Sequence, residues 1–133
     1  MEQKLKKLFP LQHPQHVILG VGLIGMGLIL IFDDYYFFWP PFAVKVLNDD
    51  LIGGVFVVIG LLLLKWALGD KNSIDINHNL LVLASGLLGT ESTAEFMHGY
   101  ESGHPHMYMA GWVMLILLLI TFSIIRRSPK HEN

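Results

Sequence analysis

The chain has 133 residues, a formal net charge of -2, 53% hydrophobic residues and a positive mean hydropathy. It contains no cysteine, which excludes a disulfide framework and a thiolate metal site. Such an apolar composition favours a membrane protein over a helical bundle in water, and the last apolar stretch has almost no amphipathic period, which disfavours the bundle further.

The chain begins with a basic arm, residues 1–15, that mixes apolar side chains with lysines. Its apolar residues are Leu5, Leu8, Phe9 and Leu11. This mixture predicts a short interfacial helix on the membrane surface, which would end near Pro10 or Pro14.

Apolar stretches fill most of the remaining sequence, and each is close to the roughly 20 residues that an α-helix needs to cross a bilayer. They are Val17–Phe32, Leu51–Leu68, Leu80–Met97 and Met107–Ile125. A helix is the expected form, because backbone polar groups that face lipid must be satisfied within the segment. The sequence therefore predicts an all-α membrane protein in which residues 1–133 form one domain of four transmembrane helices.

Basic residues alternate along the chain in a way that predicts the topology. They gather in the arm, in the second connection and in the tail 126–133, as Lys4, Lys6, Lys7, Lys65, Lys71, Arg126, Arg127 and Lys130. Because such residues stay cytoplasmic near helix ends, both termini and the second connection should lie inside.

Acidic residues follow the opposite pattern and predict an acidic outer vestibule that concentrates cations. The members of this vestibule would be Asp33, Asp34, Asp49, Asp50 and Glu101. The alternative is that the acids merely follow the insertion rules, which are indifferent to acids outside. Between these acids, Trp39-Pro40-Pro41 predicts an ordered loop on the membrane surface, because the double proline cannot continue a helix.

Small residues recur in the first two spans and predict close helix packing, because they let membrane helices approach one another. Gly20 and Gly27 lie on one face of the first span, two turns apart, and Gly53 and Gly60 recur in the second. These spans should therefore lie against protein.

The third span is the most polar one, and it is where we expect function. Glu91, Glu95 and His98 stand at i, i+4 and i+7, so a helix would present all three on one face, as a helix that lines a pore or site would. Ser85, Gly89 and Ser92 form a second, small-residue stripe that could pack against a neighbour. The alternative is a shorter span followed by a water-exposed loop over residues 90–105.

Imidazole and carboxylate groups near this segment suggest a divalent metal site at the outer loop, made from Glu95, His98, His104 and His106. The pair Glu95 and His98 resembles the Glu-x-x-His element of carboxylate-bridged metal bundles, although one copy falls short of the two that those bundles use. The more ordinary alternative is a set of histidines in an exposed loop. No cofactor is required by any motif.

No nucleophile elbow, phosphate-binding loop or His-Glu-x-x-His motif occurs, so the sequence does not indicate an enzyme. In size, short connections and charged tails, the chain resembles the small multi-span membrane proteins of bacteriophages and mobile elements, among them holins. That resemblance implies self-association in the bacterial cytoplasmic membrane to open a lesion or channel.

The sequence thus favours a homo-oligomeric pore in the lipid bilayer, with no nucleic-acid partner. An oligomer would give Glu91 and Glu95 a shared polar axis, which a lone four-helix unit has little interior to provide. The alternatives are an immunity, exclusion or regulatory subunit that binds another membrane protein, and a transporter or metal-handling protein.

Overall fold

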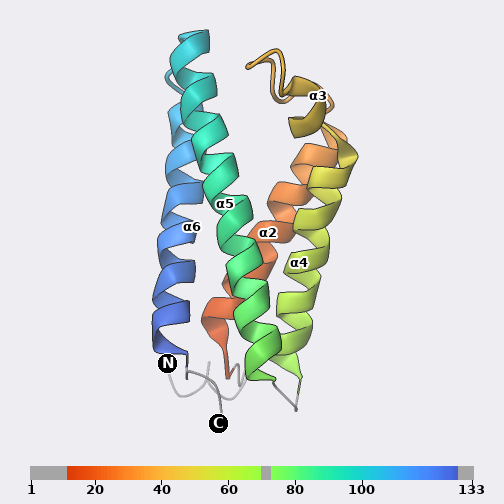
Figure 1. The fold of residues 1–133 in the computed structure, drawn as a ribbon, viewed down its shortest axis with the longest axis vertical. Coiled ribbons are helices and arrows are strands. Elements are labelled where there is room, and N and C mark those ends of the chain that lie inside the picture. The colour runs from red at the N-terminus through yellow and green to blue at the C-terminus, as the bar shows by residue number, and fades with distance from the viewer. Residues whose placement is uncertain (1–11, 70–72, 129–133) are drawn as a thin grey trace, which may run out of the picture.

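The computed structural model describes residues 12–69 and 73–128, and over these residues it contains helices and no strand. The helices are α2 (Pro14–Phe32), α3 (Val44–Leu47), α4 (Asp50–Leu68), α5 (Ile74–Ser102) and α6 (Met107–Arg127). Figure 1 shows the long helices α2, α4, α5 and α6 arranged as a column, with α3 at the end opposite the start of α2 and the end of α6. The end that carries α3 is called the distal end below, and the other is called the terminal end.

Three helices begin or end within a few residues of the predicted spans, whereas α5 is much longer than expected. The Ser73 hydroxyl accepts from the backbone N–H of Ile76 at 3.4 Å and so caps an earlier start. Gly103, with φ 68°, stops the helix in the left-handed conformation that glycine adopts most readily. Pro14 opens α2, a position where a proline fits. Most of the predicted arm, residues 1–11, lies outside the described residues.

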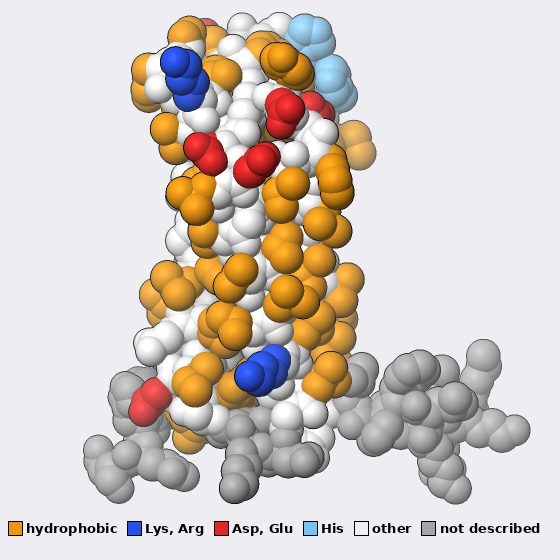
Figure 2. Space-filling view, turned by 90° about the vertical axis from the view of Figure 1, so that its right-hand side faces the viewer, with side chains coloured by type: hydrophobic (Ala, Val, Ile, Leu, Met, Phe, Trp, Pro, Cys, Tyr) orange, Lys and Arg blue, Asp and Glu red, His pale blue; other side chains and the backbone are white. Residues whose placement is uncertain are grey.

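Three segments of the described chain are long and apolar enough to cross a membrane, namely Pro14–Phe32, Val44–Leu68 and Met107–Arg127. Only a third or less of each apolar segment is buried, so most of its side chains face outward. Figure 2 shows apolar side chains gathered over the middle of one face of the column. The helix composition is that of a multi-pass membrane protein in contact with lipid, and α5 alone among the predicted spans is too polar to qualify.

α2 and α4 pack antiparallel, with backbone against backbone. A Cβ atom added at Gly20 would lie 2.9 Å from the carbonyl oxygen of Gly60, and one at Gly27 would lie 2.5 Å from that of Gly53. At Gly20 and Gly27 the helices therefore leave no space for a side chain larger than the hydrogen atom of glycine. Because the two contacts are seven residues apart on both helices, the pair stays together over about two turns. We call these four residues the glycine seam.

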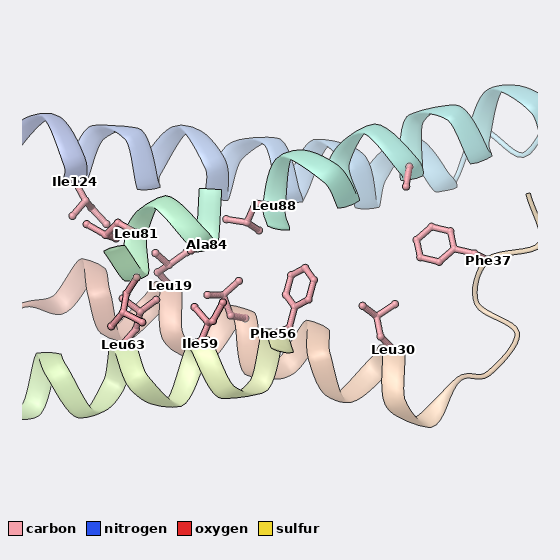
Figure 3. Packing of buried hydrophobic residues seen from close by; sticks show 13 residues of the cluster. Leu19, Leu30, Phe37, Phe56, Ile59, Leu63, Leu81, Ala84, Leu88 and Ile124 are labelled. Carbon is pink, nitrogen blue, oxygen red and sulfur yellow. The ribbon is translucent and has the colours of Figure 1, made fainter. Parts of the chain in front are cut away.

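The hydrophobic core lies between the α2–α4 pair and the α5–α6 pair. Figure 3 shows Leu19, Phe56 and Leu63 pointing across to Leu81 and Leu88 of α5. All five side chains are fully buried. In Figure 1 the two pairs lie farther apart toward the distal end, where the loop between α2 and α3 enters the space between them. That loop positions the candidate site.

Candidate functional site

The three residues predicted to share one face of the third span are buried inside the single chain. Glu91, Glu95 and His98 expose 2%, 1% and 0% of their surface, and all lie on one face of α5 that points between the two helix pairs. The alternative loop over residues 90–105 is wrong, because α5 continues through Ser102. The expectation that a lone unit lacks an interior for these carboxylates is also wrong.

Tyr36, from the loop after α2, supplies the polar partner of this face. Its hydroxyl donates a hydrogen bond to Oε1 of Glu95. Burial raises the pKa of Tyr36 well above its usual value, and the hydrogen bond to Glu95 raises it further. The phenol therefore stays protonated and remains a donor to the carboxylate.

The next two residues of the loop close over His98. The ring of Phe37 lies 5.5 Å from the imidazole ring, between centroids, and that of Phe38 lies 3.9 Å from it. The backbone N–H of Phe38 donates to Nε2 of His98 at 3.5 Å. Phe37 is itself 1% exposed, so this loop packs into the bundle in addition to any contact with the membrane surface.

Asn48 holds this part of the loop in place. Its Oδ1 accepts from the backbone N–H of Phe37 at 2.8 Å, and its Nδ2 donates to the carbonyl oxygen of Phe37 at 2.6 Å. One side chain just before α4 thus fixes both backbone polar groups of a residue eleven positions away. We call Tyr36, Glu91, Glu95 and His98, closed by Phe37 and Phe38, the acid–histidine cluster.

Two polar atoms of this cluster have no hydrogen-bond partner among the described residues. They are Oε2 of Glu91 and Nδ1 of His98, and both are buried. Within the same part of the chain, no lysine or arginine neutralises Glu91 or Glu95. An unpaired charge in such surroundings is costly, so burial of these two carboxyl groups favours their neutral forms.

The predicted metal ligands do not converge. Glu95 and His98 are buried in the cluster, whereas His104 and His106 are exposed beyond the turn at Gly103, their own rings 5.4 Å apart. In residues 12–69 and 73–128, no group of three or more His, Cys, Asp or Glu side chains is placed to hold a metal ion. The left-handed turn separates the two halves of the predicted ligand set.

The predicted vestibule acids are all exposed and lie at or near the distal ends of the helices. This group comprises Asp33, Asp34, Asp49, Asp50 and Glu101. Two of them also have local structural roles, since Asp33 accepts from the N–H of Tyr35 and Asp49 caps α4 through the N–H of Leu51. Their charge therefore surrounds the end of the molecule at which the cluster lies.

The small-residue stripe of α5 is divided between two environments. The Ser92 hydroxyl donates to the carbonyl oxygen of Gly111 in α6 at 3.0 Å. Ser85 and Gly89 instead line an open groove of about 640 Å³ with Gly86, Leu118 and Phe122. Ser92 thus joins α5 to α6, while the other two leave space beside the helix.

Sequence reasoning missed Tyr36, Phe38 and Asn48, which lie in the segment that it predicts to be a surface loop. A signal was present in the aromatic run before the double proline, because aromatic rings are as well suited to covering a buried site as to the interface. At the terminal end it also missed the buried hydrogen bond of 2.9 Å between His16 Nε2 and Asn77 Oδ1.

This chain matches no protein-family model, no curated protein and no solved structure. No family is therefore identified, and the cluster has to be interpreted from its own chemistry.

Proposed function

We propose that this protein crosses the membrane four times and that a small cation binds and passes at the acid–histidine cluster. The proton is the first candidate for this cation. The observation that carries the proposal is a pair of buried carboxylates, Glu91 and Glu95, with a tyrosine donor on one and an unpaired oxygen on the other. In membrane proteins such groups commonly belong to ion pathways and proton relays.

The exposed face of α5 supports the fourth crossing. Between residues 80 and 100 its charged side chains point inward, and the residues that face outward are Val82, Leu83, Gly86, Thr90, Thr93, Met97 and Tyr100. The hydroxyls of Thr90 and Thr93 donate to carbonyl oxygens of their own helix, at 2.9 and 2.8 Å. α5 can therefore carry two carboxylates on its inner face and still present lipid with apolar side chains and with threonine hydroxyls that are already hydrogen-bonded.

The direction of uptake follows from the charges at the two ends. Lysine and arginine residues favour cytoplasmic termini by the positive-inside rule, which would put the distal end outside. Exposed acids at that end would raise the local cation concentration. A cation would then approach the carboxylates from the distal end, where Tyr36 and Phe38 cover the cluster.

Liposomes that contain the purified protein test this proposal. We expect proton or monovalent-cation flux that falls at least tenfold when Glu91 and Glu95 are both replaced by Gln, because Gln keeps the shape and removes the charge. Asp75→Asn is the matched control, since Asp75 is exposed at the other end of the same helix, away from the vestibule acids. Equal flux in the double variant would remove the cluster from the path. No flux from the wild-type protein would favour the immunity, exclusion or regulatory subunit.

A homo-oligomeric pore is the second candidate, and the open groove beside Gly86 favours it. A Cβ atom added at Gly86 would meet nothing within 4 Å, so a helix of another copy could approach this surface closely. If it does, Gly86→Leu should reduce the oligomer population in nanodiscs, while Gly25→Leu, at another unobstructed glycine, should not. If neither variant changed the distribution of oligomeric states, the groove would be in contact with lipid and not with a second copy.

A further inference from the structure

A pocket of about 520 Å³ opens at the terminal end of the bundle, on the opposite side of the molecule from the acid–histidine cluster. It is formed where the first turn of α2 meets the last turn of α4, the first turn of α5 and the end of α6. Its location and lining are independent of the function proposed above.

Among the described residues, the polar lining of this pocket contains one cationic side chain and no carboxylate. Arg127 supplies a guanidinium, His13 and His16 supply imidazole rings, and the remaining polar side chains are amides and the Ser128 hydroxyl. Arg127 is exposed, so its guanidinium is free to move toward a ligand. Such a lining suits an anion, and a guanidinium binds phosphate oxygens with two parallel hydrogen bonds.

Part of this lining is preorganised. His16 is 7% exposed and its Nε2 lies 2.9 Å from Oδ1 of Asn77. The Trp66 ring lies 4.7 Å from the rings of both His13 and His16, between centroids, and its Nε1 donates to the carbonyl oxygen of Ser73 at 2.9 Å. These contacts hold the two imidazole rings and the Asn77 amide against their neighbours in the absence of a ligand.

The apolar surroundings indicate that the anion is carried by a lipid. Ile74, Ile124 and Trp66 supply apolar surface to the lining. Pro14–Phe32, Val44–Leu68 and Met107–Arg127 all have one end at the pocket, so it lies at the depth where headgroups meet the hydrocarbon. Cationic and aromatic side chains at this depth are suited to anionic headgroups.

We propose that this pocket binds the phosphate of an anionic phospholipid headgroup, with Arg127 as its main charged contact. The shared chemistry is a phosphate group, which a free phosphate ion could also provide. In this proposal the phosphate belongs to a lipid, and the experiment below distinguishes a lipid from a free phosphate ion.

The full chain in a mild uncharged detergent is titrated with phosphatidylglycerol, phosphatidylcholine or inorganic phosphate, and thermal unfolding is followed. We expect phosphatidylglycerol to raise the unfolding temperature in a saturable way. Arg127→Gln should lower its apparent affinity about tenfold, as the loss of a charge-assisted hydrogen bond would. Arg126→Gln is the matched control, because it removes the same charge from an exposed neighbour outside this pocket.

The other outcomes also decide the matter. An equal loss of affinity in the Arg126 and Arg127 variants would show diffuse surface attraction and overturn the pocket. Equal stabilisation by phosphatidylcholine would show that the anionic headgroup is not recognised, and this too would overturn the proposal. Stabilisation by inorganic phosphate that matches that of the lipid and depends on Arg127 would keep the phosphate site and reject the lipid as its source.

Discussion

The α2–α4 pair and the α5–α6 pair lie side by side in one bundle, yet their interfaces are built differently. In the first pair the backbones touch at the glycine seam. In the second, the Phe96 ring packs 5.8 Å from the Trp112 ring, between centroids, and Ser92 donates to the carbonyl oxygen of Gly111. A seam of glycines suits two helices that are apolar throughout. Side-chain packing leaves α5 free to turn its carboxylates toward the bundle interior.

The largest effect that this comparison predicts is at the glycine seam. Gly27→Leu should lower the free energy of unfolding by about 3 kcal/mol or more, because the new side chain would have to displace the backbone of α4. Thermal or denaturant unfolding in detergent, followed by circular dichroism, measures it.

Gly54→Leu provides the control for this prediction, since an added Cβ there meets nothing within 4 Å. It should be neutral or stabilising by up to about 1 kcal/mol, because leucine is a better helix former than glycine. If both variants lost the same stability, α2 and α4 would not be in backbone contact. The proposed difference between the α2–α4 and α5–α6 interfaces would then be wrong.

A middle-sized effect is expected at Tyr36, the loop residue whose side chain hydrogen-bonds Glu95. Tyr36→Phe should cost about 1–3 kcal/mol, because it leaves a buried Glu95 oxygen without its donor. Tyr35→Phe changes an exposed phenol by the same atom and should cost less than about 0.5 kcal/mol. If the two variants lost the same free energy of unfolding, the hydrogen bond from Tyr36 to Glu95 would not contribute to stability.

The same tyrosine gives a pH dependence with a definite sign. Because burial raises the pKa of Tyr36 in the folded state, its contribution to stability is fully present below the unfolded value of about 10. That contribution is lost as the pH rises above this value. The Tyr36→Phe variant should therefore lose less stability than the wild type between about pH 9 and 11. The free energy of unfolding, measured for both proteins over this pH range, checks the difference.

The smallest effect is expected between α5 and α6. Ser92→Ala should cost about 0.6–1 kcal/mol, which is typical of a hydrogen bond between membrane helices. Ser85→Ala should cost less, because the Ser85 hydroxyl donates to Leu81 of its own helix at 2.8 Å. A larger loss at position 85 would indicate that the open groove is covered in the assembled protein.

Most of the helical architecture could be predicted from hydropathy, because α2, α4 and α6 are apolar nearly from end to end. The length of α5 could not, since its capping residue Ser73 and its stop at Gly103 lie beyond the apolar run. Spacing did predict that Glu91, Glu95 and His98 share a face of one helix. It could not predict what covers that face, because Tyr36 and Phe38 come from about sixty residues earlier in the chain.

The glycine seam also supplies a signature by which relatives of this chain could be recognised. Two glycines seven residues apart precede the distal loop, and two more with the same interval follow it. Because each pair meets the other across the seam, a shift of one residue in either interval would bring a side chain onto a backbone carbonyl. The intervening loop has more freedom, provided that Tyr36 still reaches Glu95. Divergent sequences should therefore keep both intervals after the surrounding aliphatic residues have been exchanged.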